Sequence, residues 1–310
     1  REWWTTELRI RLPAYGYLQT GCDIVMGNPF LSQNFTNYRY GIDMSEGNWE
    51  NIITILLWGS ACFALHVGDL FVANSDAISV FKDLPFDVFM FWINYVVITR
   101  SGVELAGRYA DEKNVLTERF EIVRKAACNP NNGQDVYFAK FDYRKAGKVV
   151  PEIFYIKTPH FSKLCEVNGL PIRTVAIFNE KESVQRISAN VENLELSKGE
   201  YIFYDVWSGQ RFMGDSFSIE LPARGSRMFA VCKTDELSLF DCNFRVKSFE
   251  VIGNAIRMEN DYLVDNATLA FSRIPRDIYL NGEKVEFTVE KECVCCSLNK
   301  VGKLDIIFGD

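Results

Sequence analysis

Hydrophobic and polar residues are arranged in two different ways along this chain, and the arrangement changes near residue 149. In about the first 117 residues, short apolar segments alternate with longer apolar runs, which is the order expected of βα units in a parallel sheet or barrel. From residue 149 onward, short segments rich in Val, Ile, Phe and Tyr are separated by turn residues. Their period-two alternation indicates antiparallel strands. The pattern therefore predicts an α/β region followed by an all-β region.

Two long apolar runs in the first region are predicted to be buried helices. Residues 52–67 and 88–99 contain no Asp, Glu, Lys or Arg, and the runs are 16 and 12 residues long. Both are too short for a helix that spans a membrane. Asn48 can cap the first helix, and Pro85 suits the opening turn of the second.

The domain boundaries follow from the number of repeating units. A closed (β/α)8 barrel needs eight units in roughly 250 residues, whereas the first region holds only three or four. We therefore expect the C-terminal part of a barrel in residues 1–117, a connecting segment in 118–148, a β-sandwich in 149–233 and a second small β domain in 234–310. Within this last part, Asn281-Gly282 lies between two apolar segments and predicts a tight hairpin turn.

Charge and composition narrow the choice of partner. The net charge is −7 and the calculated pI is near 5.2, so nucleic acid or an anionic membrane is not expected as the main partner. Aromatic residues make up 14% of the chain, which suits either a packed core or a surface that faces sugars. Of these two interpretations, core packing is the commoner use of aromatic residues.

The nine cysteines and two histidines do not form a set with zinc-ligand spacing. We therefore expect no metal and no cofactor, and we interpret most cysteines as buried, reduced thiols. Cys293, Cys295 and Cys296 form a C-x-C-C cluster in which a local disulfide remains an alternative. No signal peptide is visible in the sequence, so a cytoplasmic location is expected.

Candidate chemistry is concentrated between residues 37 and 49. Arg39 and Asp43 lie on a short extended segment, neighbouring glycines allow a ligand to approach the backbone, and Trp49 could stack on a sugar ring. The structural alternative is an Arg-Asp salt bridge at the rim of a loop.

A second polar cluster follows the first apolar run. Its Asp69 could accept hydrogen bonds from a hydroxylated ligand, or it could simply cap a helix. His66 in the same cluster is more often a core residue than a base.

The order of these motifs resembles the second half of the catalytic barrel in the α-galactosidase and raffinose synthase family, glycoside hydrolase family 36 and its archaeal relatives. The resemblance covers roughly residues 15–232. It rests on these motifs: Arg39-x-Gly-x-Asp43 followed by Trp49, His66-Val-Gly-Asp69-Leu-Phe71, Ile98-Thr-Arg-Ser-Gly102, Val175-Ala-Ile-Phe-Asn179 and Tyr204-Asp205-Val-Trp207-Ser-Gly209.

The resemblance implies a retaining glycosidase that acts on an α-galactoside or a related oligosaccharide. Such enzymes use two carboxyl groups about 5 Å apart, one as nucleophile and one as general acid/base. By similarity, Asp43 is the general acid/base, and Arg39 binds a sugar hydroxyl and influences the charge of Asp43. Asp69 corresponds to an acidic residue in a loop near the pocket, where its function is less defined.

The family nucleophile, an Asp in a Lys-x-Asp motif, has no match before Asp43. Lys140-Phe-Asp142 has the right residue types, but it follows the acid/base in the chain, and we interpret it as a chance match. We therefore expect the C-terminal part of a longer enzyme, whose N-terminal half of the barrel belongs to the same or another chain. The alternatives are a non-catalytic carbohydrate-binding or assembly subunit, and a raffinose-synthase-like transglycosylase.

Overall fold

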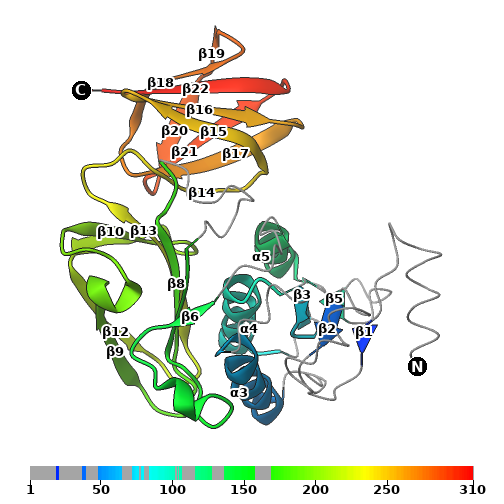
Figure 1. Cartoon of the computed structure of the whole chain (residues 1–310). Coiled ribbons are helices and arrows are strands. Elements are labelled where there is room, and N and C mark those ends of the chain that lie inside the picture. The colour runs from blue at the N-terminus through cyan, green and yellow to red at the C-terminus, as the bar shows by residue number, and fades with distance from the viewer. Residues whose placement is uncertain are drawn as a thin grey trace, which may run out of the picture.

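The computed structural model describes residues 19–20, 37–39, 48–64, 72–76, 78–79, 84–101, 103, 105–106, 116–127, 136–157 and 169–309. Within these ranges the chain forms a partial α/β region followed by two antiparallel β-sandwiches (Figure 1). This arrangement confirms the predicted fold class.

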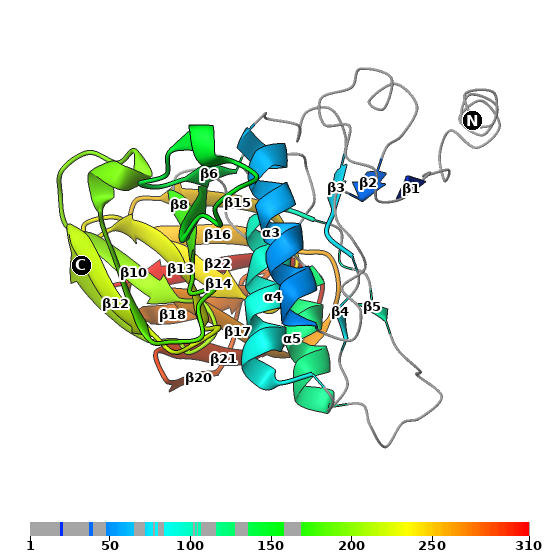
Figure 2. The same ribbon diagram turned by 90° about the horizontal axis from the view of Figure 1, so that it is seen from below.

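In its described residues, the α/β region contains short parallel strands and three helices. Strands β1 (Gln19–Thr20), β2 (Asn37–Arg39) and β3 (Val72–Asn74) pair in parallel, as do β4 (Ile78–Ser79) and β5 (Leu105–Ala106). The helices are α3 (Trp49–Ala64), α4 (Phe86–Ile98) and α5 (Thr117–Ala127). They lie between the parallel strands and the β-sandwich in both views (Figures 1 and 2).

Both apolar runs form helices, as predicted. Asn48 caps α3, since its Oδ1 accepts a hydrogen bond from the backbone N–H of Glu50 at 2.9 Å. Pro85 is the N-cap of α4, one position before the helix begins. Helix α4 is buried from Val88 to Ile98 except at Met90, because other layers cover it on several sides. No helix in the described part of the chain has the length and hydropathy needed to cross a bilayer.

The first sandwich is built on a six-stranded antiparallel sheet with strand order β11-β10-β13-β8-β7-β6. A two-stranded sheet, β9 and β12, covers one face of it and contributes to a shared core. The strand bounds are β6 (Tyr137–Phe138), β7 (Ile153–Ile156), β8 (Arg173–Phe178), β9 (Gln185–Asn190), β10 (Tyr201–Asp205), β11 (Arg211–Gly214), β12 (Ser216–Leu221) and β13 (Ser226–Lys233). Short 3-10 helices occur at η3 (Tyr143–Lys145) and η4 (Val191–Leu194).

The opposite face of this sheet packs on helices α3 and α4, so its central strands have no solvent-exposed side. Every residue of β7 and β10 is buried. The period-two alternation expected for these strands is therefore wrong, and it occurs only on the outer strands β9 and β12, which have one exposed face. The sheet also begins at β6, inside residues 118–148, which were expected to be only a connection.

The second sandwich has a core of its own, made by two facing sheets. One sheet has the order β14-β17-β21-β20 and the other β15-β16-β22-β18-β19. The bounds are β14 (Leu239–Cys242), β15 (Val246–Ile252), β16 (Ala255–Asn260), β17 (Val264–Phe271), β18 (Pro275–Leu280), β19 (Glu283–Lys284), β20 (Phe287–Glu290), β21 (Cys293–Leu298) and β22 (Gly302–Phe308). The predicted hairpin is confirmed: Asn281 and Gly282 join β18 to β19 with φ values of 52° and 84°.

Candidate functional site

The carboxyl edge of the parallel strands is where the sequence places the catalytic residues. Arg39 is the last residue of β2, and in the parallel register it lies opposite Asn74, the last residue of β3. Neighbouring strands are about 4.8 Å apart, so the last residues of β2 and β3 lie side by side. Asp43 and Asp69 lie outside the described residues, and only the backbone of Arg39 is described. Their catalytic and sugar-binding roles remain predictions.

Three polar residues at the end of β3 and directly after it, Asn74, Ser75 and Asp76, were not identified from the sequence. Asn74 and Ser75 are buried, and Asn74 Oδ1 accepts a hydrogen bond from the backbone N–H of Asp76 at 2.8 Å. Asp76 has a φ of 80°, so the chain turns sharply at this edge. The available signal was the run of polar residues directly after an apolar segment.

Trp49 is the first residue of α3 and lies between that helix and the first sandwich. Its ring makes an edge contact with Phe91 of α4 at 4.9 Å between centroids, and the Arg224 guanidinium lies 5.1 Å from the ring centroid. These contacts give Trp49 a packing role. Stacking on a sugar stays a prediction that they do not test.

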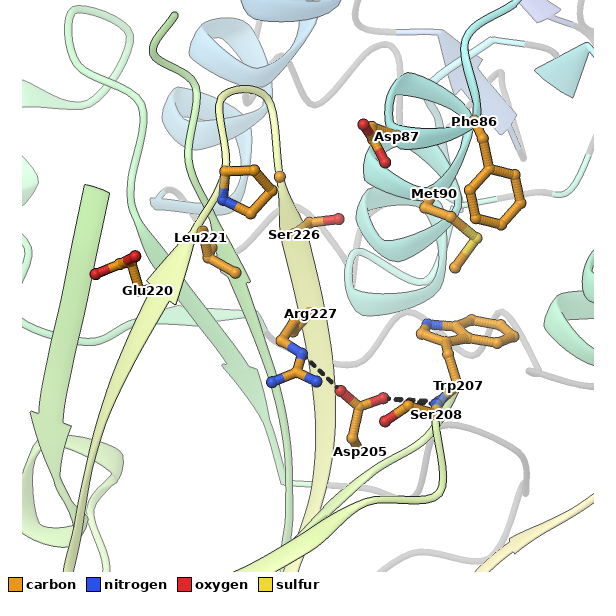
Figure 3. Close-up of a pocket in the computed structure, with 12 residues that line it drawn as sticks. Phe86, Asp87, Met90, Asp205, Trp207, Ser208, Glu220, Leu221, Ser226 and Arg227 are labelled. Carbon is orange, nitrogen blue, oxygen red and sulfur yellow. Dashed lines mark hydrogen bonds and ion pairs between the residues drawn. The ribbon is translucent and has the colours of Figure 1, made fainter. Parts of the chain in front are cut away.

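A cavity of about 360 Å³ opens between the first turns of α4 and the first sandwich (Figure 3). Phe86, Asp87 and Met90 project into it from α4. Across the gap, the loop after β10 contributes Trp207 and Ser208. The remaining lining residues come from the end of β10 and from the β12–β13 turn: Asp205, Glu220, Leu221, Pro222, Gly225, Ser226 and Arg227.

Asp205 organises the sandwich side of this cavity. One carboxylate oxygen accepts hydrogen bonds from the backbone N–H groups of Trp207 and Ser208, at 3.0 and 2.9 Å. The other forms an ion pair with Arg227 at 2.9 Å, and the Asp205 side chain is 5% exposed. These partners satisfy both oxygens of a carboxyl group that is buried away from water. Its local role is therefore to hold the loop after β10 and to orient Arg227.

Trp207 ties this loop to the helices. Its indole N–H donates to Asn94 Oδ1 at 2.6 Å, and Asn94 in turn donates to the Ser226 hydroxyl at 2.9 Å. Lys125 of α5 lies 5.2 Å from the Trp207 ring centroid and donates to the Val206 carbonyl at 2.8 Å. The sequence offers one signal for this junction, since Asn94 is a single amide inside an otherwise apolar helix.

The Lys140-Phe-Asp142 segment has the geometry of a surface turn. Asp142 caps η3 by accepting a hydrogen bond from the backbone N–H of Arg144, and it also pairs with the Arg144 side chain at 2.9 Å. The side-chain hydrogen bond from Arg144 holds the pKa of the Asp142 carboxyl below its usual value. These contacts account for the Asp at this position without a catalytic role.

The described cysteines are Cys232, Cys242, Cys293, Cys295 and Cys296, and all five are free thiols. The alternative of a local disulfide in the C-x-C-C cluster is therefore not realised, because all three lie on β21 and adjacent side chains of a strand point to opposite faces. Burial raises the pKa of the Cys232 thiol to about 12 and that of Cys296 to about 11. Among the residues that the structure describes, no group of three or more His, Cys, Asp or Glu could hold a metal ion.

Comparison with known sequences identifies one region. Residues 168–231, which contain β8 to β13 except for the last residues of that strand, match the alpha galactosidase C-terminal beta sandwich domain. No curated protein matches the sequence.

Comparison with solved structures extends the similarity of fold to the α/β region. The chain is similar to a family 27 β-L-arabinopyranosidase from Geobacillus stearothermophilus crystallised with arabinose, with 14% identity and a TM-score of 0.56 over 75% of this chain and 54% of that one. It is also similar to a putative α-galactosidase from Bacteroides fragilis, with 12% identity and a TM-score of 0.51 over 76% of this chain and 51% of that one. The chain thus spans about half the length of these structures.

Both comparisons indicate an α-galactosidase-like architecture, and neither singles out the family that the motifs resemble. The β-L-arabinopyranosidase is a family 27 enzyme, whereas the motifs resemble family 36. What the findings share is the C-terminal architecture. This chain therefore carries an α-galactosidase-like C-terminal region, in which a partial α/β unit precedes antiparallel β-sandwiches.

Proposed function

We propose that this chain is the C-terminal part of a retaining, α-galactosidase-like glycoside hydrolase with Asp43 as general acid/base. The observation that carries the proposal is the parallel register of β2 and β3, because Arg39 ends β2 and Asp43 follows it by four residues. In barrel enzymes the reactive groups lie in the loops after the strands. The sandwich match at residues 168–231 supports the same proposal.

In this mechanism Asp43 protonates the leaving oxygen and then activates the water that releases the sugar. Arg39 donates hydrogen bonds to a sugar hydroxyl and favours the charged form of Asp43, while Asp69 and Trp49 contact the sugar. The nucleophilic carboxylate comes from barrel units outside these residues, because no Lys-x-Asp motif precedes Asp43 here.

The substrate class of the proposal is an α-D-galactopyranoside or a β-L-arabinopyranoside. These sugars have the same configuration around the ring and differ in the hydroxymethyl group, which only the galactoside carries. A similar structure is a β-L-arabinopyranosidase, which supports testing both sugars. One added or missing carbon in a pocket changes selectivity by roughly 10 to 200-fold. The ratio of the hydrolysis rates of the two aryl glycosides therefore shows whether the pocket accommodates the hydroxymethyl group.

The test uses the chain alone and the chain combined with the N-terminal half of the barrel. We expect turnover only in the combined protein. There, Asp43→Ala should lower hydrolysis of substrates with poor leaving groups by about 10²–10⁴-fold. The loss on activated aryl glycosides should be smaller, because a good leaving group needs little protonation.

The matched control is Asp142→Ala, which also removes a carboxylate but should keep full activity. Equal losses on both substrate types in Asp43→Ala would contradict the acid/base role. Activity of the chain alone that disappears in Asp142→Ala would overturn the proposal, because it would make Lys140-Phe-Asp142 the nucleophile motif.

A non-catalytic carbohydrate-binding or assembly subunit is the second candidate, favoured by the missing nucleophile motif. It predicts sugar binding without turnover in the combined protein. A transglycosylase would instead pass the sugar to a second sugar rather than to water, which product analysis distinguishes. The proposal also includes a cytoplasmic location.

A further inference from the structure

We propose that the cavity between α4 and the first sandwich is a binding site for a single pyranose unit, separate from the carboxyl edge of the parallel strands. Its volume of about 360 Å³ is at the small end of the range for ligand pockets. This volume is enough for one sugar ring. No catalytic role is assigned to it, and the inference does not depend on the proposed hydrolase activity.

The cavity combines an apolar wall with polar groups, as a pyranose requires. Phe86 is 48% exposed although it is a large apolar residue, and it lies with Met90 above Trp207 (Figure 3). Covering these side chains with the apolar C–H face of a sugar ring removes hydrophobic surface from water. The Trp207 ring is already oriented by its hydrogen bond to Asn94, so it loses little freedom on binding.

The polar groups that remain available match hydroxyls rather than charges. Asp87 makes no hydrogen bond or ion pair with another described residue, so its carboxylate can accept from sugar hydroxyls. Ser226 accepts from Asn94 and keeps its own proton for donation. Arg227 uses Nε for Asp205 and Nη2 for Gln210, which leaves its second amino group directed to no described partner.

The charge balance favours a neutral ligand. Arg227 neutralises Asp205, and Arg186 pairs with Glu220 at 3.3 Å on the outer side. The remaining charge is the carboxylate of Asp87, which repels anions. A cation would lack a second carboxylate, since Asp205 is already paired. A neutral ring with several hydroxyl groups can accept hydrogen bonds from Ser226 and Arg227 and donate one to Asp87.

The experiment uses the chain with ¹³C-labelled methionine methyl groups and methyl α-D-galactopyranoside or methyl β-L-arabinopyranoside as the probe. The methyl signal of Met90 reports on this cavity, and that of Met44, which is adjacent to Asp43 in the sequence, reports on the proposed catalytic site. The two sites are thereby measured separately. We expect Met90 to shift with a dissociation constant on the order of 1 mM, given the size of the sugar.

Variants connect this shift to the cavity. Asp87→Asn should weaken the Met90 response about tenfold, because a hydrogen bond to a charged group is lost. Ser208→Trp should abolish it by filling the cavity. The matched control is Glu118→Gln, which removes an exposed carboxylate from the same position in the first turn of α5 and should leave the response unchanged.

Several outcomes overturn the inference. One is a Met90 signal that does not move with either glycoside up to about 100 mM, a hundredfold above the expected constant. Another is an equal shift with sorbitol, which lacks the ring, or a shift that survives Ser208→Trp. A response of Met44 alone would support the proposed catalytic site and contradict this one.

Discussion

The two sandwiches of this protein bury their strands in different ways. In the first, the central strands are covered on both faces, and all residues of β7 and β10 are buried. In the second, β16 of the five-stranded sheet alternates between buried and more exposed positions, whereas every residue of β14 in the other sheet is buried. The helices account for the burial in the first sandwich, because α3 and α4 cover the outer face of the six-stranded sheet, whereas no helix among the described residues contributes to the core of the second sandwich.

This comparison indicates which parts of the molecule depend on each other for stability. The core on the helix side of the first sandwich is continuous with α4 through a cluster of aromatic rings. Phe178 of β8 contacts Phe91 and Tyr95 of α4 at centroid distances of 4.9 and 6.4 Å, and Phe154 of β7 at 5.1 Å. The core of the second sandwich comes mostly from its own residues, although Leu170 also belongs to it, and Phe240 and Ala270 of β14 and β17 pack in the core of the first sandwich. We therefore infer that α4 and the first sandwich unfold together, and that the second sandwich is a separate cooperative unit.

The largest expected effect comes from Phe178→Ala. Removal of this buried ring should lower the free energy of unfolding by about 3–5 kcal/mol, because it leaves a cavity between α4 and the sheet. Hydrogen exchange should then lose protection in α4, β8 and β13 together. The matched control is Leu304→Ala, which empties a fully buried position in β22. It should cost about 2–5 kcal/mol and lose protection only in the second sandwich. If each variant lost hydrogen-exchange protection equally in both sandwiches, the second sandwich would not be a separate cooperative unit.

Lys125→Met tests the junction of helix α5 with the first and second sandwiches. It should have the next largest effect on the free energy of unfolding. Lys125 of α5 forms a short ion pair with Asp241 of β14 and donates to the Val206 carbonyl at 2.8 Å. The Asp241 side chain is 10% exposed. Loss of its cationic partner should therefore cost about 2 kcal/mol in chemical unfolding, less than for a fully buried pair because Lys125 is partly solvated.

The control for this variant is Lys198→Met, which removes a lysine that is 91% exposed and should change little. The double variant Lys125→Met with Asp241→Leu should recover part of the loss, because no buried charge is then left without its partner. Additive losses in the double variant would contradict a coupled pair.

Sequence patterns predicted strands in both sandwiches, but the alternation expected for β7 and β10 of the first does not occur. Alternation and the Asn281-Gly282 pair are local signals, so the hairpin and the strands of residues 234–310 could be derived from them. A strand covered on both faces is continuously apolar, and periodicity alone cannot distinguish it from a buried helix. The helices α3 and α4 were predictable because each apolar run exceeded the usual strand length and carried a start signal.

The candidate sites differ in the same way: a site residue next to its strand in the sequence could be predicted, whereas residues that meet only through packing could not. Arg39 could be assigned to the end of a strand, because motif and strand are adjacent in the chain. The cavity beside α4 could not be predicted, since Trp207 and Asn94 are 113 residues apart and meet only through the packing of helix on sheet. Asp43 and Asp69 lie outside the described residues, so their assignments rest on the motif resemblance and on the strand that precedes Asp43.

Gly282→Ala should have a smaller effect, confined to the second sandwich. Gly282 has a φ of 84°, and no atom lies within 4 Å of the position that a Cβ would take. The cost therefore comes from backbone strain alone, about 1 kcal/mol. Loss of protection from hydrogen exchange should begin in β18 and β19. Gly309→Ala, at an open position without a positive φ, is the matched control and should be neutral. A larger loss that reaches α4 would show that the two sandwiches unfold together.

The smallest expected effect is a pH dependence in the first sandwich from Glu195→Gln. Glu195 pairs with Lys157 at 3.0 Å, and the hydrogen bonds from Lys157 and then Tyr155 hold the pKa of the Glu195 carboxyl below its usual value of 4.5. Because the folded state binds this proton less readily, the stabilisation is present above pH 4.5 and is lost as the pH falls through the lowered pKa. Its size should be under about 1 kcal/mol, since the Glu195 side chain is 53% exposed and the pair is screened.

The same contact with Glu195 raises the pKa of Lys157 above 10.5, so the stabilisation is also lost as the pH rises through the raised pKa of that lysine. The difference in unfolding free energy between the parent chain and Glu195→Gln should therefore be constant from about pH 5 to 9 and shrink at both ends. Chemical unfolding measured across this range checks it, with Glu200→Gln as the control, an exposed residue without an ion pair among the described residues. A difference that stays constant down to pH 3 would mean that Glu195 acts through packing rather than through its charge.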